Sequence, residues 1–330
     1  MNKHERLTEV YQNAERIQFD NESKLVFFSD VHRGDNSWAD EFARNQTIYT
    51  YALEYYLGND FTYIEVGDGD ELMKNIGYRS IRIAHAPIYK LLKEYYAQGQ
   101  FYYIYGNHDI LYKIKENVVN AMYKYYNMET ERVEPLFPGL DVHEGLVLEH
   151  QETGRDLFVT HGHQGEFIND RYWQISRFFL RYLWRPLQML GLHNPIRVSR
   201  NPERRRDVEN ELINWITEHQ QPLLCGHTHD PHFPKPNEAP YFNSGSCVFP
   251  RWITGIEIDN GEIMHVRWRV KPSHNGGMFV QREVTGGPES IADYLDKDSY
   301  ELDQPDEVLA PGRKSSDPVS VPRDPGTLSN

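Results

Sequence analysis

Five short apolar runs, each ending in Gly, Asp, Asn or His, recur along the chain and constrain its fold more than any other feature. They cover residues 24–30, 61–68, 100–109, 156–163 and 222–229. Each resembles a buried strand that leads into a polar loop. Helical spacing is found between them over residues 38–57, 81–97 and 207–219, and also over the first 21 residues. This alternation predicts an α/β fold, with helices covering the faces of a sheet.

The polar ends of these runs carry oxygen and imidazole donors without thiolates. They supply, in order, Asp30-x-His32, Asp68, Asn107-His108-Asp109, His161-Gly162-His163 and His227-Thr228-His229. Ligands of α/β sheets gather at the carboxyl ends of strands, so we expect these side chains to meet there. Such donors suit Mn²⁺, Fe or Zn²⁺. Two adjacent metals need a bridge, and the carboxylate of Asp68 is the natural one.

Two ambiguities remain at the level of the residues. In the segment GDGDE, Asp70 and Glu71 compete with Asp68 as ligands. We favour Asp68 because it directly follows a strand and a glycine, and expect the other two to support the ligands or cap a helix. In HGH, either His161 or His163 could bind a metal. One Asp-x-His is weak evidence, since such residues often cap helices or turns, but five motifs in order argue against coincidence.

The ordered set DxH, GD, GNHD, HGH and GHTH resembles the calcineurin-like metallophosphoesterase superfamily over residues 24–269. The resemblance implies a four-layer αββα sandwich, of α/β class or α+β in some schemes, with two divalent metal ions. Mn²⁺ is favoured, and Fe, Zn²⁺ and Mg²⁺ are alternatives. One metal would take Asp30, His32, Asp68 and His229, and the other Asp68, Asn107, His161 and His227. His108 would face the phosphate as proton donor or charge stabiliser, and Asp109 would hold its ring.

The activity that the resemblance implies is hydrolysis of a phosphomonoester, phosphodiester or pyrophosphate bond. A hydroxide that bridges the two metals would be the nucleophile. The expected substrate is a phosphorylated small molecule, or a nucleotide or lipid-linked one. Alternatives on the same site are a nuclease or a protein phosphatase, and a catalytically inactive scaffold is a further alternative.

Residues 166–206 interrupt the strand–helix rhythm as a basic insertion. They hold nine arginines and three acidic residues, a charge of +6 within a chain of net charge −14. At helical spacing, Arg177 and Arg181 lie on one stripe and Phe178 on the wide apolar side, and Pro186 is expected to kink or end the helix. The insertion is similar to that of the UDP-2,3-diacylglucosamine pyrophosphatase branch, where a helical lid covers the active site.

The insertion leaves three hypotheses open. As a lid, its aromatic side chains would face the site, and Arg177, Phe178 and Arg181 would contact substrate. Alternatively, the helix packs on the sheet with its arginines in solvent, or residues 171–191 contact a membrane surface. His163, just before the insertion, is expected to support the ligands or to contact substrate.

Composition and charge also bear on binding partners, cellular location and domain limits. The net charge of −14 argues against stable binding to duplex nucleic acid. Two cysteines, a polar first segment and no apolar run near ~20 residues favour the cytoplasm, with peripheral membrane contact as an alternative. We expect a metallophosphoesterase domain over residues 1–284 and an acidic, largely disordered tail over 285–330. Within that tail, residues 285–304 are expected to form at most one weak helix.

Overall fold

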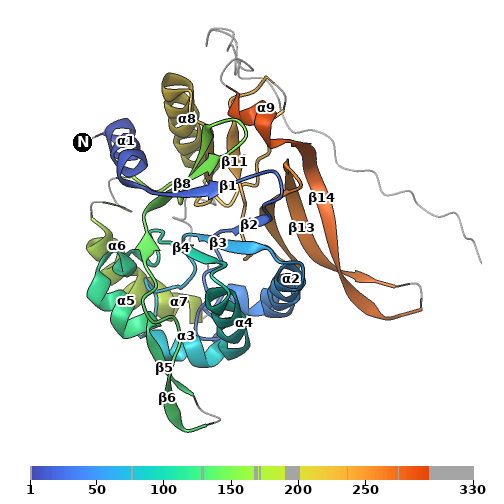
Figure 1. The fold of residues 1–330 in the computed structure, drawn as a ribbon. Helices are drawn as coiled ribbons and strands as arrows, with labels where there is room; N and C mark the ends of the chain where they lie inside the picture. The colour runs from blue at the N-terminus through green and yellow to red at the C-terminus, as the bar shows by residue number, and fades with distance from the viewer. Residues whose placement is uncertain are drawn as a thin grey trace, which may run out of the picture.

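Two large sheets and a small hairpin make up the β structure (Figure 1). The computed structural model describes residues 2–75, 77–127, 130–166, 170, 172–189, 201–235, 237–273 and 275–296. The five-stranded sheet has the spatial order β1 (Glu15–Phe19), β8 (Gly145–His150), β9 (Arg155–Thr160), β10 (Leu223–Cys225) and β11 (Tyr241–Asn243). The seven-stranded sheet has the order β14 (Met278–Ser290), β13 (Glu262–Pro272), β12 (Trp252–Asp259), β2 (Leu25–Phe28), β3 (Thr62–Val66), β4 (Phe101–Ile104) and β7 (Val142–His143). The hairpin is β5 (Lys124–Asn127) with β6 (Arg132–Pro135).

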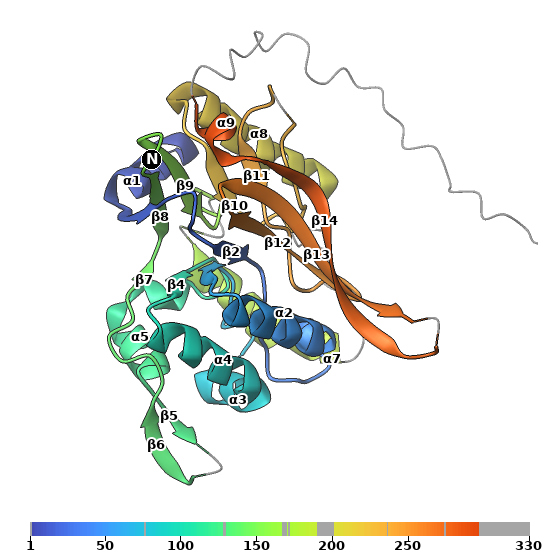
Figure 2. The ribbon, with the colours of Figure 1, turned by 45° about the vertical axis from the view of Figure 1, so that its right-hand side comes forward.

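Helices cover the outer face of each large sheet. Those packed on the five-stranded sheet are α1 (Lys3–Asn13) and α8 (Pro202–His219). On the side of the seven-stranded sheet are η1 (Phe42–Asn45), α2 (Gln46–Gly58), α3 (Tyr78–Ala84), α4 (Ala86–Ala97), η2 (Ile110–Lys113) and α5 (Lys115–Met122). Figure 2 shows α2 and α4 beside this sheet and α8 on the far side of the molecule. The order of layers is therefore helix, sheet, sheet, helix, which confirms the predicted αββα sandwich and α/β class.

Alternation along single strands explains why the two sheets stack. In β2, Val26 and Phe28 enter the core beneath the helices, whereas Leu25 and Phe27 enter the core between the sheets. In β10, Leu224 likewise lies between the sheets. Because side chains of a strand point alternately to opposite faces, a run that is apolar at every position can pack on both.

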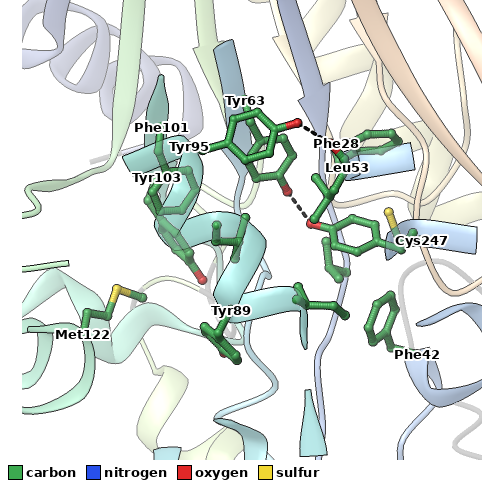
Figure 3. Packing of buried hydrophobic residues seen from close by; sticks show 14 of the residues in the cluster. Phe28, Phe42, Leu53, Tyr63, Tyr89, Tyr95, Phe101, Tyr103, Met122 and Cys247 are labelled. Carbon is green, nitrogen blue, oxygen red and sulfur yellow. Dashed lines mark hydrogen bonds between the residues drawn. The ribbon is translucent and has the colours of Figure 1, made fainter. Parts of the chain in front are cut away.

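The core under α2 and α4 is rich in tyrosine, which accounts for part of the high aromatic content. The hydroxyl of Tyr95 donates to the carbonyl of Leu53 at 2.7 Å, and the hydroxyls of Tyr49 and Tyr63 lie 2.5 Å apart. Figure 3 shows Tyr63 and Tyr95 among Phe28 and Leu53 in this core. Each of these buried hydroxyls thus has a partner, so the rings contribute apolar area without an unsatisfied polar atom.

The parallel strands bring the predicted ligand loops to one edge. Strands β2, β3 and β4 pair in parallel, as do β9, β10 and β11. The parallel ladder continues past the strands, since the amides of Asp30 and His32 donate to the carbonyls of Gly67 and Asp68 at 3.0 and 2.8 Å. The loops after β2 and β3 are therefore fixed by backbone hydrogen bonds before any side chain is considered.

All five predicted strands are confirmed, and the helices differ in their limits. Trp38 lies outside any helix and is 84% exposed, because the helical segment begins only at Phe42. The predicted helix over 81–97 is divided into α3 and α4 at His85, where Pro87 lies in the first turn of α4. Pro87 has no amide to donate to the carbonyl of Ile83, so one continuous helix would lose this hydrogen bond, whereas the first turn of a helix does not need it.

The predicted boundary at residue 284 is wrong in position. Strand β14 crosses it and pairs with β13 as far as Ser290. The helix α9 (Ile291–Leu295) then buries Ile291, Tyr294 and Leu295 in the core between the sheets. The acidic composition of the tail hid these apolar residues. Residues 297–330, including the stretch predicted to be disordered, lie outside the described part.

The insertion contains a helix with an irregular centre. It consists of α6 (Trp173–Phe179), the π-helical turn η4 (Leu180–Trp184) and α7 (Arg185–Met189). Pro186 lacks an amide and would clash with the carbonyl four residues before it in a regular helix. The wider π turn lies directly before Pro186, so the helix continues to Met189 rather than ending.

Candidate metal centre

Four of the predicted ligands surround a common point at the ends of β2, β3 and β10. The Nε2 atom of His32 lies 3.2 Å from Nε2 of His229 and 3.7 Å from carboxylate oxygens of both Asp30 and Asp68. His229 Nε2 lies 3.0 Å from Asp30 Oδ1. Asp30, His32 and Asp68 are buried. Two carboxylates and two imidazoles can thus direct their donor atoms to one ion.

Asp68 connects this group to a second one at the end of β9. Its Oδ2 atom lies 3.4 Å from Nε2 of His161, which lies 3.3 Å from Oδ1 of Asn107. The other ring nitrogen of His161 donates to the carbonyl of Val66 at 2.9 Å, so in the neutral ring Nε2 is the nitrogen with the lone pair. His227 is the outermost member, with its ring centroid 5.2 Å from that of His161. All seven predicted ligand positions therefore lie at one edge, with Asp68 between the two groups.

One oxygen of each aspartate is held by the backbone of a neighbouring motif. Oδ1 of Asp68 accepts from the amide of His108 at 2.7 Å, and Oδ2 of Asp30 accepts from the amide of His227 at 2.8 Å. The remaining oxygen of each carboxylate faces the histidines. Gly106 makes this approach possible, because a Cβ there would overlap the carboxylate of Asp68. The motifs thus orient one another's donor atoms.

Five of the predicted ligands have left-handed backbone conformations. They are Asp30 (φ 51°), His32 (φ 52°), Asp68 (φ 55°), His227 (φ 68°) and His229 (φ 56°). Left-handed backbone costs a residue with a side chain roughly 1–2 kcal/mol. Strain of this kind clusters at functional sites, where the surrounding structure holds it in place.

The electrostatics of the centre favour a bound cation. Burial alone would lower the pKa of His32, but the carboxylates of Asp30, Glu71 and Asp68 raise it to about 9. Burial opposes the same effect at His161, where Asp68 and Asp30 raise the pKa to about 10. Without a metal, protons on these rings neutralise the carboxylates. Because a metal needs the same nitrogens unprotonated, its binding releases protons.

The ring of His108 is held by Glu71, so the expectation that Asp109 holds it is wrong. Nδ1 of His108 lies 2.9 and 3.0 Å from the two carboxylate oxygens of Glu71. Lys74 contributes a second cation, with Nζ 3.6 Å from Glu71. Burial alone would raise the pKa of Glu71, but His108 and Lys74 hold it well below its usual value. The contact leaves Nε2 of His108 to face a substrate.

Asp109 instead closes the loops around the ligands. It accepts from the amides of Gly69 and Gly106 at 2.8 and 2.6 Å, and from the hydroxyl of Tyr103 at 2.8 Å. Burial and the charge of Asp68 raise its pKa to about 7. A carboxylate that follows a loop histidine could hold the histidine ring or the backbone of the loops. The sequence does not show which way it points.

Asp70 is engaged away from the predicted ligands, which removes it from the alternatives in GDGDE, whereas Glu71 lies near His32 and His108. It pairs with the buried Arg33, whose Nε lies 2.9 Å away, and accepts from the hydroxyls of Tyr89 and Tyr112. Arg33 also lies 2.8 Å from Glu65. Asp70 therefore belongs to a buried network beneath the loops, and Asp68 alone of the three acids faces both histidine groups.

His163 lies beside the second group with neither ring nitrogen hydrogen-bonded to another described residue. Its ring is buried, 5.4 Å from His161 and 6.3 Å from His227 between centroids. Burial, followed by these two neighbours, lowers its pKa well below the usual value. Its predicted contact with substrate stays a prediction.

Two arginines of the insertion, Arg181 and Arg185, contact the protein. Arg181 donates through Nη2 to the carbonyls of Leu72, at 2.9 Å, and Asn75. Arg185 pairs with Asp35 in the loop after β2. Both contacts lie in loops that directly follow predicted ligands. The hypothesis of a helix with solvated arginines is therefore wrong for Arg181 and Arg185, and Arg181 lies near Glu71, which acts on its pKa.

The apolar side of α6 and α7 is exposed. Phe178 is 59% exposed, and its ring packs edge-on against Phe179 and obliquely against Tyr182. Ile175 and Leu183 lie on the same side and are also exposed. Trp173 and Leu180 pack on the core of the seven-stranded sheet instead. Phe178 as a substrate contact stays a prediction.

The sequence reasoning missed Glu166, which lies 2.7 Å from Nε2 of His227. No local pattern indicates this contact, because the two residues are 61 positions apart. The sequence indicates Glu71 only as a supporting residue. Its position three residues after Asp68, at the start of a turn, is the available signal for its contact with His108.

Known proteins match the chain in family and, distantly, in structure. A family model for calcineurin-like phosphoesterases matches residues 23–231, which include every predicted ligand position. The crystal structure of Chaetomium thermophilum Vps29 is similar with 8% identity and a TM-score of 0.37, covering 80% of this chain and 96% of that chain. A hypothetical protein from Thermus thermophilus has 13% identity and a TM-score of 0.31, covering 80% and 100%. No curated protein sequence matches significantly.

Each helix in the described part of the chain is too short or too polar to cross a lipid bilayer.

Proposed function

Because the chain belongs to the calcineurin-like phosphoesterase family, we propose that it is a dinuclear metal-dependent hydrolase of phosphoester or phosphoanhydride bonds. The observation that carries the proposal is the convergence of seven donor side chains from five strand ends, five of them in left-handed conformations. Oxygen and imidazole donors of this kind suit Mn²⁺, which we propose as the preferred ion. Structural packing alone gives no reason to strain so many residues at one edge.

The donor set fits two divalent ions. Oδ1 of Asp30 is buried and faces Nε2 of His229 and of His32 at 3.0 and 3.7 Å, and Asp68 lies between the two groups. The first ion would be held by Asp30, His32, Asp68 and His229, and the second by Asp68, Asn107, His161 and His227. When bound, such ions activate water near neutral pH and neutralise charge on the phosphoryl oxygens.

His108 would supply the proton for the leaving oxygen. Its Nδ1 faces the carboxylate of Glu71, so Nε2 is the ring nitrogen that would face the leaving oxygen and donate to it. Lys74 and Arg181 lie beside Glu71 and make this side of the centre positive. Charge growing on the substrate's oxygens would be stabilised there.

Two arginines of the insertion, Arg177 and Arg181, favour a substrate with more than one anionic group. Arg181 is hydrogen-bonded to the loop that follows Asp68. Nε of Arg177 is buried without a hydrogen-bond partner among the described residues. Burial and neighbouring charge lower the pKa of Arg177. A second phosphate or another anion would relieve this repulsion. We therefore favour a nucleotide-like or lipid-linked phosphate or diphosphate in the cytoplasm, over a protein phosphatase or nuclease substrate.

The test is a panel of substrates with purified metal-free protein to which Mn²⁺ is returned. We expect hydrolysis of bis(p-nitrophenyl) phosphate or p-nitrophenyl phosphate, and faster turnover of substrates with two phosphates. Asp68→Ala should abolish both activities. Glu149→Ala, at an exposed pair with Arg16 on β8, is the matched carboxylate control and should be active. A folded protein that binds no metal and hydrolyses no member of the panel would support a scaffold instead.

A further inference from the structure

Glu166 makes the closest contact to a predicted ligand from outside the five motifs. Its Oε1 lies 2.7 Å from Nε2 of His227, and the two side chains are only 14% and 4% exposed. A carboxylate that is largely buried against an imidazole needs this partner, since neither group can turn to bulk water. The contact joins the loop after β9 to the loop after β10.

The contact determines which ring nitrogen of His227 can bind a metal. A carboxylate accepts hydrogen bonds only, so Nε2 of His227 must carry the proton that it donates to Glu166. Nδ1 is then the nitrogen with a free lone pair. His161 has the opposite arrangement, because its Nδ1 donates to Val66 and its Nε2 faces Asp68. The two histidines predicted for the second ion thus present different nitrogens.

The backbone of Glu166 is held by hydrogen bonds to His163 and Asp170, and Asp170 is in contact with the first helix. Its amide donates to the carbonyl of His163 at 3.1 Å, and the amide of Asp170 donates to the carbonyl of Glu166 at 3.0 Å. The carboxylate of Asp170 accepts from the amide of Gly165 at 2.9 Å and from Nε of Arg6 at 3.3 Å. Arg6 in α1 is therefore connected through Asp170 to the backbone of Glu166.

We propose that Glu166 is a positioning residue for the second metal, which sets the tautomer and ring orientation of His227 so that Nδ1 is the ligand atom. This inference rests on the proposed function, since it requires that two metals bind. A carboxylate behind a metal-bound histidine also makes the imidazole a stronger donor. Removal of such a partner typically weakens metal binding about 10–100-fold.

The test is calorimetric titration of metal-free protein with Mn²⁺, in which the two equivalents are fitted separately. Glu166→Ala should weaken the second equivalent by about 10–100-fold and leave the first unchanged. Glu166→Gln should recover part of this loss, because its amide oxygen still accepts from Nε2. The matched control is Glu144→Gln, which alters another carboxylate partner of Arg6 and keeps the pair of Glu166 with His227. It should bind both equivalents like the wild type.

Two results would overturn the proposal. Glu166→Ala with both affinities unchanged would show that the pair only closes the turn, and equal weakening of both equivalents, with a lowered Tm of the metal-free protein, would show general loss of structure. A failure of the proposed function looks different, because the wild type itself would then bind fewer than two equivalents, and both proposals would fall together.

Discussion

The strand-end metal centre and the helical insertion carry charge in opposite ways. In the centre, buried carboxylates and imidazoles face one another at 3.0–3.7 Å and are held by backbone amides of neighbouring loops. In the insertion, Arg181 and Arg185 contact the loops that follow predicted ligands, and large apolar residues such as Phe178 are exposed. One region hides its polar groups inside the fold, and the other exposes the groups that normally form a core.

The difference shows what each region requires. Buried charges are tolerated only when they are paired or when they bind an ion, so the carboxylates of the centre need either protonated imidazoles or the metal ions that we propose. The exposed apolar side of α6 and α7 is stable in the chain because the arginines anchor the other side. It is therefore available for contacts outside the described residues. Variants on the two regions should accordingly affect different properties.

The largest effect is expected for Asn107→Ala in the centre. Asn107 is predicted to bind only the second ion, so metal content should fall from two ions to about one per chain and turnover should be lost. Metal analysis after gel filtration and an assay with p-nitrophenyl phosphate would measure both. Retention of two ions with full activity would show that Asn107 is no ligand.

A large loss of activity without loss of metal is expected for His108→Asn. Loss of a proton donor lowers kcat by roughly 10²–10⁴-fold, and metal content should stay at that of the wild type. Glu71→Gln should have a smaller effect in the same direction, because Nδ1 of His108 keeps an acceptor. Asp109→Asn is the comparison, and should lower Tm more than kcat. Loss of metal in His108→Asn would assign the ring to metal binding instead.

The pH dependence of the centre provides an intermediate effect. The pKa values of His32 and His161 in the folded protein, about 9 and 10, lie above the value of 6.5 for a free histidine. Their contribution to the stability of the metal-free protein is therefore fully present below pH 6.5 and lost as the pH rises through 9 and 10. Melting curves of metal-free protein should show this fall, and Mn²⁺ should bind more tightly as pH rises over the same window. An unchanged Mn²⁺ affinity between about pH 7 and 9 would contradict it.

The smallest effects are expected in the insertion and distinguish its two sides. Arg181→Ala removes hydrogen bonds to two carbonyls and should cost about 1–2 kcal/mol, less than for a buried charge because Arg181 is partly exposed. Phe179→Ser should change stability by less than about 0.5 kcal/mol. If the apolar side contacts lipid, as predicted for residues 171–191, only Phe179→Ser should reduce sedimentation with vesicles. A large loss of stability in Phe179→Ser would place this side in the core.

Local sequence was sufficient to predict the strands and the types of ligand. It was not sufficient to predict the direction in which individual side chains point. The five strands follow from apolar runs such as that of β2, and the ligands follow from the polar residues at their ends. Which neighbour holds His108 depends on tertiary contacts, so Glu71 and not Asp109 emerged only from the structure. The orientation of the helix in the insertion likewise depends on tertiary contacts. Its periodicity indicates two opposite sides but cannot show which one faces the protein, because both packings satisfy the same spacing.

Strand β12 has a consequence for the time at which this protein can fold. It pairs with β2, with Ile256 opposite Phe27, so a segment made early in synthesis waits for one made more than 220 residues later. A nascent chain that has just passed His229 already contains every predicted ligand but lacks β12, one of the two neighbours of the strand that presents Asp30 and His32. Such distant pairing slows folding and leaves strand edges exposed meanwhile. We therefore expect the metal centre to assemble only after translation has passed β12, and truncated chains that end shortly before it to require chaperones or to be degraded.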